Sequence, residues 1–465
     1  MSSALKSQFD SLKRNGGAFA LSGSSQIISS LTNFGIVLYL VRILEKDDFG
    51  LYSLGFASYL IISALLAAIF AVQYVVNNPD RAEHERRSYA MHHVVAMIII
   101  SILIVLLAAM LKVALSIDSE LIYIVQDLAL PVAMATLGFA TRDMVVRIAF
   151  VERREWLVLG SAMSVATSTA IAFFIIHILS INQSASMGLG IVAFSQLIGA
   201  VFTLYMLRLP WCQLSFGELR KAFVESWQGG RWYAMTSIVY SVRTQAHNFV
   251  ILPILGLAAL AEVNATRILL TPAVMAIPPL YQVVMPRLAE MRGRNPVVVQ
   301  RHIWITVAGL VGFALIYSAA LLSVLDIALP LALGPSYAAL EPVVLAWCAV
   351  TVFMAARNGL TMGLEIRKEF KDMLIVNSSA ALVAIILAAG FSFFWGGMGA
   401  VWAFAMAELI LCLLLYRVLM RALTKEKLAD EGKTESHGAV ASVGKSQNQD
   451  SLQRGDMVPP MVPKR

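Results

Sequence analysis

The chain has 465 residues, of which 58% are hydrophobic and only 14% are charged, and its formal net charge is +7. Soluble domains are about 45–50% apolar and about 25% charged, so this composition excludes an ordinary soluble fold and predicts a protein that crosses the membrane many times. The positive charge is spread over short loops, which argues against a nucleic-acid-binding patch.

A membrane-spanning helix needs about 20 mostly apolar residues. Twelve stretches meet this requirement: 19–41, 50–76, 91–117, 121–141, 157–179, 186–208, 233–255, 265–286, 303–329, 341–363, 373–395 and 398–420. The first stretch is too long for the apolar core of a cleaved signal peptide, so no cleavage is expected. The predicted fold is therefore an all-α membrane protein with twelve transmembrane helices.

The basic residues distinguish the two sides of the membrane. One set of alternate loops holds most of them, including the loops 81–87 and 287–301. The opposite loops hold little more than Arg42, Lys46 and Lys112. Because positively charged loops remain in the cytoplasm, both termini are predicted to be cytoplasmic. A miscounted helix would disrupt the alternation, so the pattern also supports twelve spans.

Four polar side chains occupy one face of the first predicted span. They are Ser22, Gln26, Ser29 and Asn33, at offsets of 0, 4, 7 and 11 residues. Such spacing places all four on the same side of a helix. In contact with lipid, their hydroxyl and amide groups would have no hydrogen-bond partners, so this face is predicted to line a wet cavity.

Weak internal similarity at an offset of 214 or 215 residues relates the two halves of the chain. The polar face of the first span recurs in the seventh as Thr236, Tyr240, Arg243 and His247. Thr136, Ala140, Arg142 and Asp143 in the fourth span correspond to Thr351, Ala355, Arg357 and Asn358 in the tenth. A basic, acidic and aromatic motif at 153–156 recurs at 367–370. The second six spans are therefore predicted to repeat the first six in parallel orientation.

This repeat divides the chain into four segments. Residues 1–208 form the first six-helix bundle and residues 233–421 the second, with the linker 209–232 between them. Part of the linker, Phe216–Trp227, is predicted to be an interfacial helix because aromatic and basic residues favour the membrane boundary. The polar tail 422–465 cannot bury a core and is predicted to be a disordered cytoplasmic segment.

No enzyme motif is recognised in the sequence. There is no nucleophile elbow, phosphate-binding loop or redox pair, and no spacing of residues that suits a metal. Cys212, Cys348 and Cys412 lie far apart, so neither a disulfide framework nor a metal cluster is predicted. No catalytic residue, metal or cofactor is therefore expected.

Three stretches resemble one family of membrane proteins. The segment TNFGIVLYLVRIL followed by DDFGLYSLGFA, within residues 32–57, is similar to the first helical hairpin of the Wzx-type polysaccharide flippases. The outer loop LALGPSYAALEPVVLAW (331–347) and the eighth span ATRILLTPAVMAIPPLYQVVMPRLAEM (265–291) resemble the same family. These flippases belong to the multidrug/oligosaccharidyl-lipid/polysaccharide (MOP) exporter superfamily. The motifs are diagnostic together rather than singly, and the resemblance covers roughly residues 10–421.

The resemblance implies two six-helix bundles in a V around a central cavity that opens to one side at a time. It implies that the substrate is undecaprenyl diphosphate carrying an oligosaccharide, translocated across the bacterial inner membrane for synthesis of O-antigen, exopolysaccharide or capsule. The implied partners are this lipid and the bilayer, with a polysaccharide polymerase and a chain-length regulator as candidate protein partners and no nucleic acid.

Arginines within spans are the main candidates for substrate binding, because the guanidinium group stays ionised and grips phosphate oxygens in a bidentate fork. An arginine at mid-membrane costs about 2.5–3.5 kcal/mol on insertion scales, so one without a use is unexpected. Arg243 is the first candidate, with a structural ion pair as the alternative. Arg357 and its repeat counterpart Arg142 follow, the latter with snorkelling to the interface as an equal alternative. Arg267 and Arg42 lie near helix ends and contribute either to the outer part of the path or only to those ends.

Uncharged and acidic groups complete the candidate site. Gln26, Asn33 and Tyr240 on the polar faces are candidate substrate contacts. For coupling to an ion, the candidates are Glu408, Asp127 and His247. A buried carboxylate can carry a proton or pair with an arginine, and for Glu408 the two interpretations are equally supported. A single histidine inside a membrane is more often a packing residue.

Two other functions are consistent with the hydropathy. A cation-coupled drug exporter of the same superfamily would favour carboxylates over arginines in its cavity, and this chain has the reverse. A membrane glycan polymerase or ligase usually carries a large outer loop, and every predicted outer loop here is short.

Overall fold

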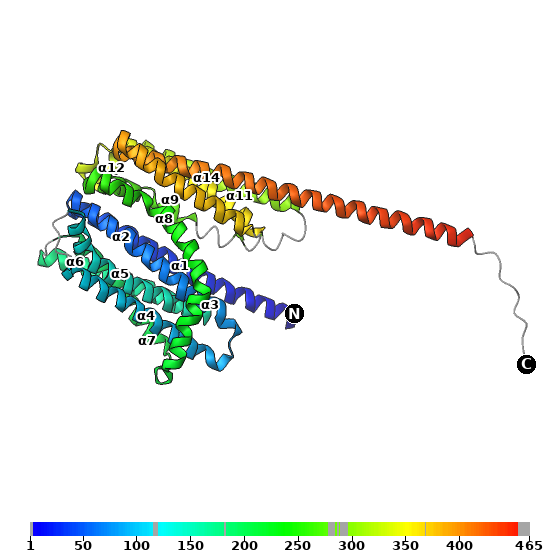
Figure 1. The fold of residues 1–465 in the computed structure, drawn as a ribbon, viewed down its shortest axis with the longest axis horizontal. Helices are drawn as coiled ribbons and strands as arrows, with labels where there is room; N and C mark the ends of the chain where they lie inside the picture. The colour runs from blue at the N-terminus through cyan, green and yellow to red at the C-terminus, as the bar shows by residue number, and fades with distance from the viewer. Residues whose placement is uncertain are drawn as a thin grey trace, which may run out of the picture.

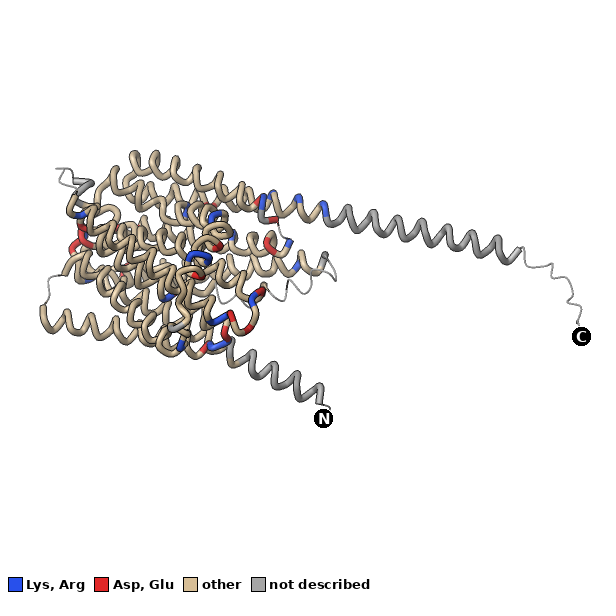
Figure 2. The backbone as a smooth tube through the Cα atoms, turned by 60° about the horizontal axis from the view of Figure 1, so that its bottom comes forward, with Lys and Arg blue, Asp and Glu red and all other residues tan. Residues whose placement is uncertain are grey.

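The structure, a computed structural model, describes residues 3–114, 120–180, 183–277, 284–285, 288, 296–367 and 369–453. Nearly all of these residues are helical, and no strand occurs among them. Charged residues gather near the two ends of the helices, whereas long middle sections carry few of them (Figure 2). Within the described ranges, 10 helices are long and apolar enough to cross a membrane. The chain is therefore a multi-pass membrane protein.

The first six predicted spans form the N-half, helices α1 to α7. Their bounds are α1 Ser3–Ile43, α2 Lys46–Leu66 continued by η1 Ala67–Ala71 and α3 Val72–Asn77, α4 Glu83–Ala114, α5 Glu120–Val151, α6 Glu155–Leu179 and α7 Ala185–Leu207. A left-handed residue, Ser180, ends α6, and the Ser184 hydroxyl caps the start of α7 by accepting from the Met187 amide at 3.2 Å.

The remaining spans form the C-half, helices α8 to α14. Their bounds are α8 Phe216–Ile268, α9 Thr271–Met275, α11 Pro296–Ser323, α12 Leu325–Leu333, α13 Glu341–Ile366 and α14 Phe370–Gln453. Two of these helices contain a break in helical geometry, α8 at Gly256 and α14 at Trp395 and Gly396. The chain turns back at each break, so α8 and α14 each contain parts of two predicted spans. The predicted twelve-helix fold is confirmed.

Two predicted boundaries differ from the structure. The eighth span was predicted to start at residue 265, but the helix restarts directly after Gly256, whose φ of 81° suits glycine and few other residues. Its end, including residues 278–283, lies outside the described residues. The ninth span was predicted as 303–329, whereas α11 ends at Ser323 and a separate helix, α12, follows.

The tail also differs from the prediction. Residues 422–465 were predicted to be a disordered segment. Helix α14 continues as far as Gln453, and residues 454–465 lie outside the described residues. The start of this segment, 424–430, reads TKEKLAD and is rich in good helix formers. Helix nucleation has already occurred in the spanning part of α14, so extension adds hydrogen bonds without a new nucleation cost.

The two halves share a hydrophobic core at one end only, called here the hairpin end, which carries the turns at residues 44–45, 256 and 334. This core combines residues such as Tyr52 and Leu128 with Leu260 and Trp347. At the opposite end, called the terminal end, there are two cores. One lies in the N-half and includes Leu219, Phe223 and Ala234 from the first limb of α8, and the other lies in the rest of the C-half. Both chain termini project from the terminal end (Figure 1). The two halves therefore share a core at the hairpin end, whereas at the terminal end the N-half shares its core only with the first limb of α8.

Polar contacts reinforce the junction at the hairpin end. The Lys46 ammonium lies 2.6 Å from a carboxylate oxygen of Glu262 and also above the Tyr337 ring. A β-carbon at Gly50 would collide with the carbonyl oxygen of Leu257, so only glycine allows α2 and α8 to approach this closely. These contacts join the N-half to the C-half across the plane between them.

Candidate functional site

A cavity of about 480 Å³, called here the central cavity, lies between the two halves. Helices α1 and α2 supply one wall, and α8, α9, α13 and α14 supply the other. Its volume lies in the range typical of small-molecule sites. Its polar lining residues are Asn33, Ser53, Tyr240, Thr244, Gln245, Asn248, Asn264, Arg267, Thr271, Thr351, Arg357 and Glu408.

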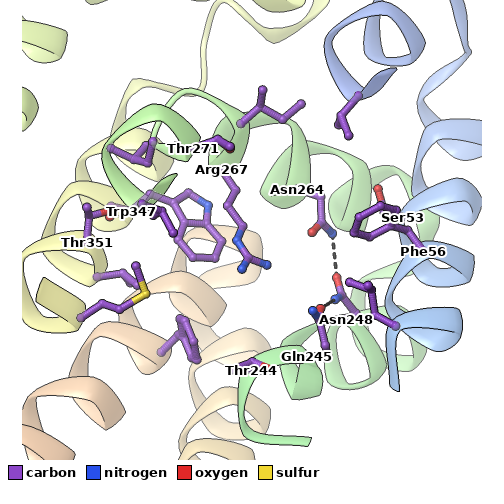
Figure 3. A pocket seen from close by; sticks show the side chains of 18 of the residues that line it. Ser53, Phe56, Thr244, Gln245, Asn248, Asn264, Arg267, Thr271, Trp347 and Thr351 are labelled. Atoms are coloured by element: carbon purple, nitrogen blue, oxygen red, sulfur yellow. Dashed lines mark hydrogen bonds between the residues drawn. The ribbon is translucent and has the colours of Figure 1, made fainter. Parts of the chain in front are cut away.

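Three amide side chains form a chain of hydrogen bonds on the α8 wall of the central cavity (Figure 3). The Asn264 amide donates to the Asn248 carbonyl oxygen at 2.7 Å, and the Asn248 amide donates to the Gln245 carbonyl oxygen at 2.9 Å. The first of these bonds crosses the break at Gly256 and joins the two limbs of α8. None of these three residues was predicted from the sequence, although Gln245 and Asn248 give a recognisable signal, because they are two amides inside an apolar span.

Arg267 lines the central cavity, and its guanidinium group has no anionic partner among the described residues. Its guanidinium lies 5.4 Å from the centroid of the Trp347 ring, a cation–π contact visible in Figure 3. The Trp347 indole is itself fixed, because its Nε1 donates to the Val263 carbonyl oxygen at 3.0 Å. An arginine remains ionised in proteins, so Arg267 presents an uncompensated positive charge to the central cavity.

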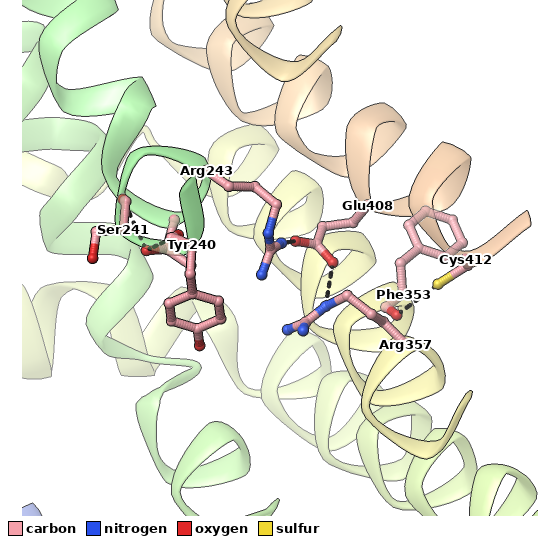
Figure 4. A network of polar contacts seen from close by, with 8 residues as sticks. Tyr240, Ser241, Arg243, Phe353, Arg357, Glu408 and Cys412 are labelled. Carbon is pink, nitrogen blue, oxygen red and sulfur yellow. Dashed lines mark hydrogen bonds and ion pairs between the residues drawn. The ribbon is translucent and has the colours of Figure 1, made fainter. Parts of the chain in front are cut away.

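Arg243, Glu408 and Arg357 form a buried charge cluster in the C-half (Figure 4). Arg243 Nη1 donates to Glu408 Oε1, and Arg357 Nε donates to Glu408 Oε2 at 2.8 Å. The side chains of Arg243 and Glu408 are only 3% and 2% exposed. Two guanidinium groups and one carboxylate leave the cluster with a net charge of +1.

The geometry of this cluster bears on whether Arg243 and Glu408 contact the central cavity or form a structural ion pair. Arg357 and Glu408 line the central cavity, whereas Arg243 is buried and is not among the lining residues. Arg243 therefore forms an ion pair, as its alternative interpretation predicted, and Glu408 is paired with both arginines. The roles of Arg243 in substrate binding and of Glu408 in ion coupling stay predictions.

A second cavity of about 690 Å³, called here the N-half cavity, lies among α1, α5, α6 and α7. The polar part of its lining consists of Ser22, Ser25, Gln26, Ser29, Asn33, Arg142, Asp143 and Gln196. The predicted polar face of α1 therefore does line a cavity. Asn33 belongs to the lining of both cavities, so the two meet at this residue.

Arg142 is held in the wall of the N-half cavity by neutral groups. Its Nε donates to the Ser161 hydroxyl at 3.1 Å, its Nη1 to the Gln196 carbonyl oxygen at 3.0 Å and its Nη2 to the Ser29 hydroxyl at 3.4 Å. The neighbouring carboxylate, Asp143, pairs with Arg147 at 2.8 Å. Arg142 is therefore oriented into the protein, and it does not snorkel to the interface.

The remaining predicted residues lie in different places. Tyr240 lines the central cavity and Gln26 the N-half cavity. Arg42 lies at the hairpin end, where its Nε donates to the Ala332 carbonyl oxygen at 2.9 Å. His247 is buried beside Trp347 and Phe404, and neither His247 nor Asp127 is among the lining residues of the two cavities.

The chain matches the polysaccharide biosynthesis protein family over residues 17–292, more than half of its length. Among proteins of curated function, no match is found. The lipid II flippase MurJ, in an inward closed conformation, is 13% identical with a TM-score of 0.71, covering 88% of this chain and 90% of that one.

Two other solved structures share the fold. An inward-facing multidrug resistance MATE family transporter of the MOP superfamily is 12% identical with a TM-score of 0.67, covering 88% of this chain and 99% of that one. A MOP superfamily transporter from Pyrococcus furiosus is 13% identical with a TM-score of 0.57, covering 89% and 95%. The chain therefore belongs to the polysaccharide biosynthesis protein family and has the two-lobed fold of the MOP superfamily, which confirms its resemblance to the Wzx-type flippases.

Proposed function

We propose that this protein translocates undecaprenyl-diphosphate-linked oligosaccharide across the bacterial inner membrane by alternating access of the central cavity. Membership in the polysaccharide biosynthesis protein family and the transporter fold support a role in moving a lipid-linked glycan. The glycan would then enter O-antigen, exopolysaccharide or capsule synthesis, with a polymerase and a chain-length regulator as downstream partners.

The observation that carries this proposal is the excess of positive charge in the central cavity. Arg267 and Arg357 line it, and Glu408 is the carboxylate among its described lining residues. Glu408 is already engaged by Arg357 and by Arg243. A diphosphate offers several oxygens that an arginine fork binds in bidentate fashion, so the free guanidinium of Arg267 suits it.

A cation-coupled drug exporter is the alternative, since MATE transporters share the fold. Negative charge and aromatic faces in a cavity both favour an organic cation. The central cavity has aromatic lining residues such as Tyr52, Phe56 and Phe404. The charged residues that line this cavity carry a net positive charge, because Arg267 and Arg357 outnumber Glu408. This polarity favours an anionic substrate.

The proposal can be tested in proteoliposomes. Undecaprenyl diphosphate carrying one fluorescently labelled sugar would be reconstituted with the protein, and dithionite would quench the label on the outer leaflet. Protein-dependent quenching of the inner-leaflet pool, without uptake of ethidium in parallel vesicles, is the expected result. Ethidium uptake without lipid movement would establish the drug-exporter alternative and overturn the proposal.

The positive-inside pattern supports cytoplasmic termini for this protein. The terminal end would then face the cytoplasm, and the hairpin end would face the opposite side. In this arrangement the halves are closed on the outer side by the contacts of Lys46 and Glu262.

Cross-linking across the hairpin end should stop transport. In a variant lacking Cys212, Cys348 and Cys412, the pair Lys46→Cys and Glu262→Cys would be joined by a cleavable bismaleimide. Because the halves must part at this end to release substrate, we expect lipid translocation to fall to the protein-free level and to recover when the linker is cleaved.

The uncross-linked pair serves as the control for this experiment. The Lys46–Glu262 ion pair is about one-third exposed, so its loss alone should cost only about 0–1 kcal/mol and leave transport intact. Undiminished translocation by the cross-linked protein would contradict alternating access at this end.

A further inference from the structure

The two cavities differ in the kind of chemical group that they can bind. In the central cavity, Arg267 makes no hydrogen bond or ion pair within the described part of the chain. The charged residues that line this cavity are two arginines, Arg267 and Arg357, and one carboxylate, Glu408. In the N-half cavity, the carboxylate of Asp143 pairs with Arg147, and the hydrogen-bonding fork of Arg142 is occupied by the neutral partners Ser161, Gln196 and Ser29. The N-half cavity is therefore less suited to an anion.

The N-half cavity instead offers neutral hydrogen-bonding groups. Hydroxyls and amides line it at Ser22, Ser25, Gln26, Ser29, Asn33 and Gln196. The side chains of Gln26 and Asn33 are exposed, and neither makes a hydrogen bond within the described ranges. Amides both donate and accept, which suits the hydroxyl groups of a sugar.

The polar face of α1 connects the two cavities in a line. Asn33 lines both, and from there the face runs along α1 to Ser22, toward the terminal end. Eleven residues of α-helix span about 16 Å, at a rise of about 1.5 Å per residue. A diphosphate attached directly to its first sugar needs an anion site and a sugar site that adjoin, as these two cavities do.

We propose that the N-half cavity is the glycan subsite, and that it binds neutral, hydroxyl-rich sugar residues through Gln26 and the adjoining hydroxyls while Arg267 and Arg357 hold the diphosphate in the central cavity. This inference rests on the proposed function. It divides one substrate between two cavities, with Asn33 at the boundary.

Native mass spectrometry of the purified full-length protein can test this division with two probes. One probe is undecaprenyl diphosphate, which carries no sugar, and the other is the lipid-linked oligosaccharide fraction extracted from membranes of the source organism. Gln26→Leu is expected to weaken binding of the glycan lipid about fivefold to tenfold, the effect of a lost hydrogen-bonding group, and to leave undecaprenyl diphosphate binding unchanged. Arg267→Ala is expected to weaken binding of both probes.

Thr32→Val is the matched control, because Thr32 is also on α1 but bonds only to the Ile28 carbonyl oxygen and lines neither cavity. It should bind both probes as the wild type does, and all variants should elute as monodisperse protein. Equal binding of the glycan lipid by Gln26→Leu and wild type would overturn the inference, as would an equal loss of both probes. Failure of the wild type to bind either probe would overturn the proposed function itself.

Discussion

Replacement of Glu408 by glutamine is expected to destabilise the protein by about 3–5 kcal/mol, the usual cost of leaving buried charges without their partner. Arg243 and Arg357 would then face each other with no carboxylate between them, in a cluster whose side chains are almost fully buried. We expect a large fall in the yield of monodisperse protein and in its melting temperature, measured by fluorescence-detected size exclusion after heating.

A compensating variant distinguishes charge imbalance from simple loss of packing. Arg243→Gln combined with Glu408→Gln removes one charge of each sign and keeps Arg357 as the cation of the central cavity. This double variant should recover most of the lost stability. Glu341→Gln, an exposed carboxylate at the start of α13, is the matched single control and should melt like the wild type. A Glu408→Gln protein with unchanged melting temperature would contradict the role given to the cluster.

Replacement of Arg267 by alanine should abolish transport without loss of the fold. When one partner of a buried charge pair between protein and substrate is truncated, the binding free energy weakens by about 2–5 kcal/mol. This loss corresponds to a dissociation constant at least about 30-fold higher. Folding stability should be unchanged or slightly higher, because the variant removes a cation that has no anionic partner in the described residues. The dithionite assay measures transport, and thermal unfolding measures stability.

Two further variants sharpen this test. Arg267→Lys keeps the charge but loses the planar fork and the stacking on Trp347, so partial activity is expected. Arg301→Ala removes an exposed arginine of α11 and should transport at the wild-type rate. Normal transport by Arg267→Ala would remove the basis for an anion site in the central cavity.

The sequence predicted the local features of this protein better than the pairing between distant side chains. Hydropathy located the spans, and helical spacing placed Gln26 and Asn33 on a cavity wall, because both depend on neighbouring residues. The partnership of Arg243 with Glu408 joins residues 165 positions apart, and no local pattern encodes it. For that reason the sequence could not predict that Arg243, the first candidate for substrate binding, is buried in an ion pair and is not among the lining residues of the central cavity.

Backbone geometry accounts for the other differences. The restart of the helix after Gly256 depends on a positive φ, and glycine is too frequent in membrane helices for the residue alone to mark the position. The chain of amides at Asn264, Asn248 and Gln245 forms only because the two limbs of α8 fold together there. Family resemblance supplied the two-lobed arrangement, which hydropathy does not determine.

The apolar core shared by both halves at the hairpin end has an energetic consequence for the transport cycle. Parting the halves there exposes apolar surface at about 25 cal/mol per Å² wherever water replaces the contact. At the terminal end, the C-half beyond the first limb of α8 has a core of its own and shares none with the N-half. The state that is closed at the hairpin end therefore keeps this shared core intact. In the proposed cycle, the cost of opening the hairpin end must be offset by substrate binding or by a coupled energy source, whereas its closure is favourable.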